Sequence, residues 1–180
     1  MKVPKCGNLL FIGFMGVGKS TLAKELAKEL KTVCLDTDKI IENMENKKIK
    51  NIFSTKGEEY FRELEQKVAI WLEKNVKNSI ISTGGGFIAV GNLKKIGKII
   101  YLKSSFDGIM KRLENHPKSK EKLAKRPLLQ DRKRAKELFK RRSDTYKKLA
   151  DITINVEKYK NKREMIKELM KLFDTNVSSR

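Results

Sequence analysis

The sequence predicts an α/β fold in which a five-stranded parallel sheet is flanked by helices. Short apolar runs of strand length alternate along the chain with segments that have the apolar periodicity of helices. Such alternation is typical of a parallel sheet covered on both faces. With 180 residues, 39% of them hydrophobic, the chain is long enough for a core of its own. We therefore expect a single domain over residues 1–180.

The first half of the chain contains three expected strands. The first is an apolar run that Gly13 stops, and the next segment has one apolar stripe, as a helix packed on a sheet has. Gly57 is expected to break a helical region in two. In order, we expect a strand at 8–12, a helix at 19–30, a strand at 33–35, short helices from about 40 to 56, a helix at 58–74 and a strand at 79–82.

The second half supplies two more strands and a basic segment. We expect a strand at 98–102, a helix at 106–114, a mobile loop at 116–126, a helix at 131–149, a strand at 152–156 and a closing helix at 163–173. The loop is expected because the segment is polar and lysine-rich. Ligands of parallel sheets bind beyond the carboxyl ends of the strands, so we expect the chemistry just after Ile12, Leu35 and Ser82.

A phosphate-binding loop follows the first expected strand. The sequence from Gly13 to Thr21 matches G-x-x-x-x-G-K-[ST], with a strand before it and a helix after it. Glycines let backbone N–H groups curl around phosphates, and the helix N-terminus adds positive charge. Lys19 is expected to reach the β- and γ-phosphates of ATP, and the Ser20 hydroxyl to bind Mg²⁺. The expected nucleotide-binding residues here are Gly13, Gly16, Val17, Gly18, Lys19, Ser20 and Thr21.

Two carboxylates follow the second expected strand. Asp36 and Asp38 are two residues apart, and one could belong to the Mg²⁺ shell while the other accepts a proton from an attacking hydroxyl. The other interpretation is a helix cap, with Thr37 or Asp38 at the N-cap position. The sequence alone leaves both open, and no histidine–cysteine cluster has the spacing of a metal site.

Two arginines differ in their predicted surroundings. On a helical wheel, Arg142 falls in the middle of an apolar stripe, where an arginine needs an anionic partner. That partner could be a ligand or one of the chain's own carboxylates. Arg62 points away from the stripe that Tyr60, Leu64, Val68 and Trp71 define, which indicates a surface arginine. Glu65, one turn further on, could orient Arg62 or form an ordinary ion pair on the helix surface.

Beyond these features, the chain contains five further motifs: Asp36-Thr-Asp38, Phe61-Arg62-x-x-Glu65, Thr83-Gly84-Gly85-Gly86, Arg126-Pro127-Leu128-Leu129 and Arg142-x-x-x-Tyr146. They occur in the order and spacing of shikimate kinases, a family that the chain resembles over about residues 9–156. The resemblance implies a fold similar to that of nucleoside monophosphate kinases. It also implies Mg-ATP-dependent phosphorylation of the 3-hydroxyl of shikimate, within aromatic amino-acid biosynthesis.

The resemblance also implies roles for individual residues. Arg62 and Arg142 would bind the shikimate carboxylate, and two guanidinium forks suit a planar carboxylate. Asp38, Lys19 and Arg126 would be catalytic, with Arg126 on the lid. The implied substrate-binding region is about 36–64 and the implied lid about 114–128. The remaining implied contacts are Arg112 and Arg126 with the nucleotide, Gly84, Gly85, Gly86 and Asp38 with the acceptor, and Ser20 and Asp36 with Mg²⁺.

Several interpretations compete with these roles. The three glycines could form a plain tight turn, Arg112 could be a solvated helix arginine, and His116 is expected at the surface. Another small-molecule kinase, acting on gluconate or a nucleotide, would share the phosphate loop. A GTPase is disfavoured because the chain has no [NT]-K-x-D motif.

The net charge of +20, from 42 basic and 22 acidic residues, has two interpretations. A nucleic-acid-binding protein is one, and a lysine-rich solvated surface is the other. We expect the second, because the basic residues are spread along the whole chain and not interleaved with aromatic ones.

The expected partners follow from the motifs and the resemblance, and the expected location follows from what the sequence lacks. We expect ATP and shikimate as small-molecule partners, no nucleic acid, no membrane and a monomer. The two cysteines, Cys6 and Cys34, are too few for a disulfide framework, so we expect a reduced, cytoplasmic protein. The N-terminal apolar run is too short for a signal peptide, and no stretch has the length of a membrane span.

Overall fold

The structure, a computed structural model, describes residues 7–124 and 126–174. Cys6 lies outside this part of the chain, as does Lys125 of the expected lid. The described residues form a five-stranded sheet of order β2-β3-β1-β4-β5, in which every neighbouring pair is parallel. The strands are β1 (Leu9–Ile12), β2 (Cys34–Asp36), β3 (Ile80–Ser82), β4 (Lys98–Lys103) and β5 (Ile152–Asn155). The predicted fold class and all five strands are confirmed.

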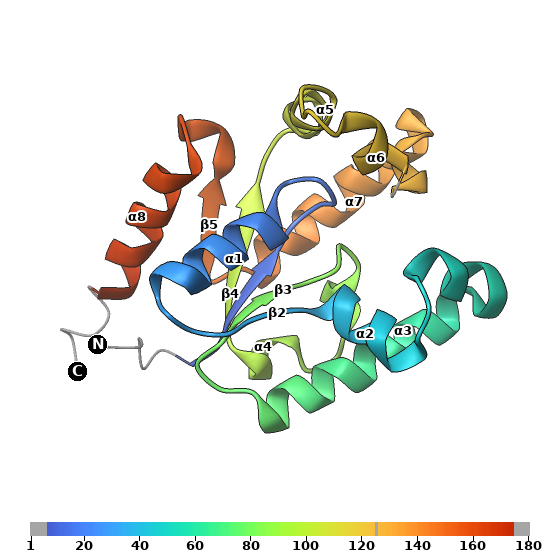
Figure 1. The fold of residues 1–180 in the computed structure, drawn as a ribbon, viewed down its shortest axis with the longest axis horizontal. Coiled ribbons are helices and arrows are strands. Elements are labelled where there is room, and N and C mark those ends of the chain that lie inside the picture. Colours follow the sequence, from blue (N-terminus) through green and yellow to red (C-terminus); the bar gives the residue numbers. More distant parts are fainter. Residues whose placement is uncertain (1–6, 125, 175–180) are drawn as a thin grey trace.

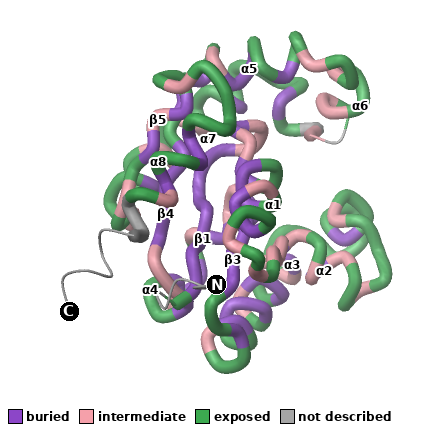
Figure 2. The backbone as a smooth tube through the Cα atoms, turned by 60° about the vertical axis from the view of Figure 1, so that its left-hand side comes forward, coloured by how far each residue is buried: buried purple, intermediate pink, exposed green. Residues whose placement is uncertain are grey.

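The centre of the sheet forms the core. Leu10 of β1 lies beside Ile81 of β3 and Ile99 of β4, and all three side chains are fully buried. Figure 2 shows this continuous buried centre with exposed residues around it. Strands buried on both faces explain why their sequences are uninterrupted apolar runs without polar alternation.

Helices cover both faces of the sheet. The helix α1 contacts β1, β2 and β3 and lies beside α8, whereas α7 contacts β4 on the opposite face (Figure 1). The helices are α1 (Lys19–Glu29), α2 (Thr37–Glu45), α3 (Ile49–Asn75), α4 (Leu93–Ile96), α5 (Phe106–Glu114), α6 (Ser119–Ala124), α7 (Arg132–Leu149) and α8 (Lys162–Asp174). Short 3₁₀ helices occupy Phe87–Ala89, Pro127–Leu129 and Val156–Lys158.

Two details of the helices test the sequence analysis. Gly57 has φ 80° and ψ 179°, so it kinks α3 at the position where a break was expected. The prediction of a loop over residues 116–126 was wrong for its middle part, because α6 occupies Ser119–Ala124. Its sequence, SKEKLA, contains good helix formers, and the high charge of the segment concealed this propensity.

A buried asparagine joins three chain segments at the amino end of the sheet. Asn8, only 3% exposed, donates through Nδ2 to the carbonyl oxygens of Val76 (2.7 Å) and Ile96 (2.9 Å). Its Oδ1 accepts a hydrogen bond from the backbone N–H of Ser79 (3.1 Å). Gly97 packs so closely against Asn8 that a Cβ there would overlap the Asn8 backbone. These bonds close the end of the sheet opposite to the phosphate loop.

The carboxyl ends of the strands point toward two helical arms. After β2 the chain forms α2 and the first part of α3, and after β4 it forms α5 and α6 (Figure 1). The phosphate loop follows β1, and the glycine turn follows β3. The predicted motifs therefore gather at one edge of the sheet. Among the described residues, no helix is long and apolar enough to cross a membrane.

Candidate active site

The loop between β1 and α1 has the backbone geometry of a phosphate-binding loop. Gly16 and Gly18 have positive φ angles of 86° and 104°, which residues with side chains rarely adopt. At Gly13, a Cβ would lie 2.7 Å from the carbonyl oxygen of Leu102. The first turn of α1 begins at Lys19 and has no side-chain cap. Its backbone N–H groups are therefore available to an anion.

Lys19 is buried inside this loop. Its side chain is 8% exposed overall, and Nζ donates to the carbonyl oxygens of Gly13 (2.7 Å) and Phe14 (3.2 Å). Burial lowers the pKa of Lys19 to about 8, although the negative charges of Asp38 and Asp36 act in the opposite direction. The ammonium group is thus oriented by backbone oxygens at the end of the sheet where the phosphates are expected.

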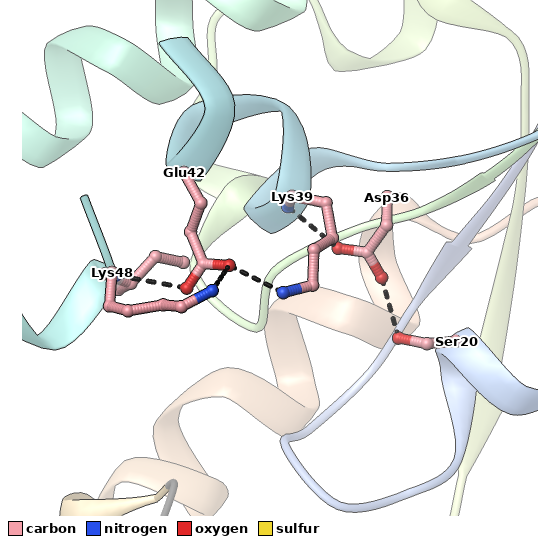
Figure 3. A network of polar contacts seen from close by, with 6 residues as sticks. Ser20, Asp36, Lys39, Glu42 and Lys48 are labelled. Carbon is pink, nitrogen blue, oxygen red and sulfur yellow. Dashed lines mark hydrogen bonds and ion pairs between the residues drawn. The ribbon is translucent and has the colours of Figure 1, made fainter. Parts of the chain in front are cut away.

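Ser20 and Asp36 meet across the ends of β1 and β2. The Ser20 hydroxyl donates to Asp36 Oδ2 at 2.8 Å, while Asp36 Oδ1 accepts from the backbone N–H of Lys39 at 3.3 Å. Figure 3 shows these contacts and a neighbouring cluster in which Glu42 binds Lys39 and Lys48. One hydroxyl and one carboxylate oxygen therefore lie side by side next to the phosphate loop.

Asp36 is also the N-cap of α2. The interpretation that Thr37 or Asp38 forms this cap was wrong, because α2 already begins at Thr37. Thr37 is fully buried, and its hydroxyl accepts a hydrogen bond from the backbone N–H of Gly84 (3.0 Å). Asp38, in the first turn of α2, is therefore free of the capping role.

Asp38 lies against the glycine turn. A Cβ at Gly84 would overlap Asp38 Oδ1, so only glycine permits this approach. Burial raises the pKa of Asp38 to about 6; the nearby charge of Asp36 adds to the rise and Lys19 opposes it. A carboxylate with this pKa is ionised at neutral pH and still basic enough to accept a proton.

Arg62 and Glu65 form an ion pair beneath the same turn. Arg62 donates to Glu65 Oε2 at 2.5 Å and to Glu58 Oε1 at 2.6 Å. Glu65 is only 1% exposed, and burial raises its pKa although Arg62 opposes the rise. A Cβ at Gly86 would overlap the Arg62 guanidinium. The guanidinium is thus held against the glycine turn by two carboxylates.

The prediction that Arg62 is a surface residue holds only in part, because Arg62 is half-buried, with 29% of its side chain exposed. The helical wheel failed because it placed Trp71 inside, whereas Trp71 is 46% exposed. The face of α3 that packs on the domain consists of Phe61, Leu64, Glu65, Val68, Ala69 and Leu72. Because this face differs from the stripe that the helical wheel indicated, Arg62 lies at the border of the buried face.

Arg142 is partly buried on α7, between buried Ala135 and buried Tyr146. A Cβ at Gly85 would lie 3.4 Å from Arg142 Nη1, so the guanidinium borders the glycine turn. Among the described residues, no ion pair with one of the chain's own carboxylates is formed by Arg142. The interpretation of Arg142 as part of a structural salt bridge is therefore not supported by the contacts.

Two arginines come from the α5–α6 arm. Arg112 of α5 donates to the carbonyl oxygen of Val17 in the phosphate loop. Arg126, which follows α6, donates to the carbonyl oxygen of Lys122 at 2.6 Å. Next to it, Leu129 is buried and Leu128 is 55% exposed.

Electrostatics shows which predicted side chains converge. The charges of Asp38, Asp36, Arg126 and Arg142 all act on the Lys19 ammonium. Arg62 joins this group through the glycine turn, which it shares with Asp38 and Arg142. The sequence motifs included Thr37 and Tyr146, but sequence reasoning did not assign them the role of polar supports of the turn. A buried polar position within an apolar helix stripe, as at Tyr146, was the available signal.

A parallel sheet of order 2-3-1-4-5, a glycine-rich loop with a buried lysine, and a carboxylate beside a glycine turn together define a P-loop phosphotransferase of the small-molecule kinase type. The comparison with protein families agrees with this class. The family model described as shikimate kinase matches residues 15–174. The chain therefore belongs to the shikimate kinase family, as its motifs indicated.

Individual relatives support the same assignment. A shikimate kinase from a Sulfurihydrogenibium species is 41% identical over an alignment of 168 residues that covers 91% of this chain and 95% of the relative. One from Helicobacter hepaticus is 40% identical over 148 residues, 82% of this chain and 86% of the relative. The solved structure of a shikimate kinase from Acinetobacter baumannii in complex with shikimate has a TM-score of 0.82 at 28% identity and covers 96% of both chains.

The donor set fits a Mg²⁺ ion held jointly with a nucleotide. In the part of the chain that the structure describes, no group of three or more histidine, cysteine, aspartate or glutamate side chains could hold a metal alone. Mg²⁺ typically takes one or two protein oxygens and completes its shell with water and substrate phosphates. The Ser20 hydroxyl and the Asp36 carboxylate, 2.8 Å apart, provide such oxygens next to the loop.

Proposed function

We propose that this protein transfers the γ-phosphoryl group of Mg-ATP to the 3-hydroxyl of shikimate, giving shikimate 3-phosphate and ADP. The observation that carries the proposal is that one glycine turn is bordered by Asp38, Arg62 and Arg142. Two guanidinium groups suit an acceptor with a carboxylate, and an ionisable aspartate suits an acceptor with a hydroxyl. Shikimate has both groups.

The nucleotide side of the proposed site is the loop from Gly13 to Thr21. Its backbone N–H groups and the α1 N-terminus would bind the phosphates, and Lys19 would reach the β- and γ-phosphates. Ser20 and Asp36 would hold Mg²⁺, which when bound neutralises charge on the phosphates. Arg112, which already contacts the loop at Val17, would face the adenine.

The acceptor side is formed by the glycine turn and the residues around it. Arg62 and Arg142 would bind the carboxylate of shikimate, and the backbone of Gly84, Gly85 and Gly86 would contact its hydroxyl groups. Glu65 would keep Arg62 oriented through its 2.5 Å ion pair. Three adjacent glycines leave room for a close approach of ligand to backbone.

In the proposed reaction, the 3-hydroxyl oxygen attacks the γ-phosphorus while the bond to the β–γ bridging oxygen breaks. The hydroxyl proton passes to the Asp38 carboxylate, and the leaving oxygen carries its negative charge to ADP. Lys19 and Arg126 stabilise the charge on the transferring group. The proposed catalytic residues are therefore Asp38, Lys19 and Arg126.

Two parts of the single domain would move relative to the sheet. We assign substrate binding to residues 36–64, which include α2 and the first part of α3, and the lid to residues 114–128, which include α6 (Figure 1). The lid would bring Arg126 to the phosphates only after both substrates are bound. Such closure excludes water and limits hydrolysis of ATP.

A coupled assay of ADP release with a panel of hydroxylated acceptors tests the proposal. We expect release to require shikimate and Mg²⁺ together, with little release on gluconate or a nucleoside monophosphate. Turnover on gluconate or a nucleotide without stimulation by shikimate would contradict the proposed acceptor but leave the phosphotransferase class intact.

A further inference from the structure

Tyr146 is a fully buried tyrosine on α7 whose hydroxyl reaches another part of the chain. Its side chain is 0% exposed, and the hydroxyl donates to the carbonyl oxygen of Gly85 at 2.7 Å. A phenol hydroxyl is costly to bury without a partner, so a phenylalanine would fill an ordinary core position more favourably. The hydroxyl therefore requires an explanation that packing does not give.

The partner of the hydroxyl is the middle residue of the glycine turn. This turn is tethered at two successive residues, because the Gly84 N–H donates to Thr37 at 3.0 Å and Gly85 accepts from Tyr146. Glycines are the most flexible residues of a chain, and both tethers come from buried side chains. The tethers thus restrict a segment that would otherwise have several conformations.

The same hydroxyl also interacts with Arg142. The two residues are one helical turn apart, and a Cβ placed on Gly85 would lie 3.4 Å from Arg142 Nη1 and 3.7 Å from the Tyr146 hydroxyl oxygen. A phenol oxygen can donate one hydrogen bond and accept others. Tyr146 donates its hydrogen bond to the glycine turn, and the positive charge of Arg142 acts on the same hydroxyl, so the Tyr146 hydroxyl and the Arg142 guanidinium border the same glycine.

A second tyrosine fixes the ring of the first. The rings of Tyr101 and Tyr146 are stacked with centroids 5.2 Å apart and an interplanar angle of 30°. Tyr101 lies on β4 and is 2% exposed, and the polar side chains that influence its hydroxyl are Ser143 and Asp144 of α7. The sheet thus sets the position of the Tyr146 ring, and the ring sets the position of its hydroxyl.

We infer that Tyr146 is a positioning residue for the acceptor, which sets the Gly85 turn and the Arg142 guanidinium at a fixed separation. The inference rests on the proposed function, because it assumes that the turn and Arg142 bind the acceptor. Tyr146 itself does not touch the acceptor in this arrangement; it acts through the two groups that do. The nucleotide side, at the phosphate loop, is not connected to this hydroxyl by any described hydrogen bond of Tyr146.

The test compares two substitutions, Tyr146→Phe and Tyr101→Phe, each of which removes one buried tyrosine hydroxyl. In Tyr146→Phe, we expect the KM for shikimate to rise about 5- to 30-fold, which corresponds to the loss of one buried hydrogen bond. The KM for ATP should stay within about twofold of the wild-type value, since only the acceptor groups are displaced. In the matched control Tyr101→Phe, thermal stability should fall about as much as in Tyr146→Phe, while both KM values stay within about twofold of the wild-type values.

The outcomes separate the inference from the proposed function. Wild-type protein that shikimate does not stimulate would contradict the proposed function. If the wild type is active with shikimate but Tyr146→Phe has the same KM for shikimate, the inference alone is overturned. The same holds if Tyr101→Phe raises the KM for shikimate as much as Tyr146→Phe does. If Tyr146→Phe does not fold, Thr37→Val removes the other tether of the turn. We expect the KM for shikimate to rise in that variant too, and an unchanged value would also overturn the inference.

Discussion

The Ser20 hydroxyl donates a 2.8 Å hydrogen bond to the carboxylate of Asp36, which joins the first turn of α1 to the end of β2. Asp36 has a second function in the fold, because its other oxygen caps α2. The two functions reside on different atoms of one side chain. A substitution can therefore weaken the proposed metal ligand while it preserves the cap.

Asp36→Asn is expected to separate these functions. Asparagine is as good an N-cap as aspartate, so thermal stability should change little. The loss of a charged oxygen should raise the Mg²⁺ concentration that gives half-maximal rate by at least about 10- to 100-fold, which is what removal of an outer-shell partner of a metal ligand typically costs. A titration of rate against Mg²⁺ measures this, and an unchanged half-saturating concentration would argue that Asp36 acts only as the cap.

Asp38→Asn should lose turnover far more than shikimate affinity. The amide keeps the size of the side chain but cannot accept the hydroxyl proton, a contribution of typically about 10²–10⁴-fold. Because phosphoryl transfer has a loose transition state, we expect the lower half of this range. Steady-state kinetics measures kcat, and equilibrium binding measures affinity; turnover equal to that of the wild type would remove the proton-accepting role.

The pH dependence of the wild-type rate should report the two buried groups. With both substrates well below KM, the rate reflects the free enzyme. It should fall as pH decreases through about 6, where Asp38 becomes protonated, and fall again as pH rises through about 8, where Lys19 loses its charge. In Asp38→Asn the acidic limb should disappear. An acidic limb that persists in this variant would belong to another group.

Asp38→Asn should also stabilise the protein, but only at neutral pH. The folded pKa of Asp38, about 6, lies above its ordinary value of 3.8, so ionisation costs folding free energy that is absent below about pH 4 and complete above about pH 6. The full cost is at most about 3 kcal/mol, and the lost attraction to Lys19 reduces the gain. Thermal melts of both proteins at acidic and neutral pH test this; a gain of equal size at both would contradict it.

Arg142→Ala should weaken shikimate binding with little effect on nucleotide affinity. Loss of a charge-assisted partner of a carboxylate costs about 1.5–3 kcal/mol, or roughly 10- to 150-fold in affinity. Arg62→Ala is expected to behave alike, and Arg141→Ala, on the exposed side of α7, is the matched control. A shikimate analogue without the carboxylate should bind all of these proteins with equal affinity. If the arginine variants bind this analogue more weakly than the wild type does, the arginines are misassigned.

Arg126→Ala should lower kcat much more than it raises either KM. Removal of one preorganised donor to developing charge costs on the order of 10²-fold. Arg126→Lys should restore only part of the rate, because a point charge replaces a planar fork. The control is Lys120→Ala on the exposed surface of α6. Small and equal losses in both alanine variants, with intact thermal melts, would refute the lid role.

The sheet and the phosphate loop could be predicted because their signals are local. An uninterrupted apolar run between glycines specifies a buried strand, and the loop motif specifies its own backbone turn. The surroundings of Arg62 could not be predicted in the same way. They depend on which face of α3 packs on the domain, and Trp71 reversed that inference because a large apolar side chain remained exposed.

Contacts between distant segments of the chain could not be predicted from the sequence either. Nothing in the sequence near Gly84 shows that Thr37 will accept its N–H, and nothing near Gly85 indicates Tyr146, 61 residues later. Such pairs are fixed by the tertiary arrangement of β3, α2 and α7. The helix α6 was missed for a different reason, since its charge was given more weight than its helix propensity.

The three hydrogen bonds of Asn8 lie at the end of the sheet that carries no proposed chemistry. A library of random substitutions should therefore divide into two kinds of inactive clone. Clones altered at Asn8 or Gly97 should yield less protein, with normal activity per folded molecule. Clones altered around the glycine turn should yield normal amounts of protein with poor activity. Protein abundance would thus depend on one end of the sheet and activity per folded molecule on the other. Selection could then act on these two properties independently.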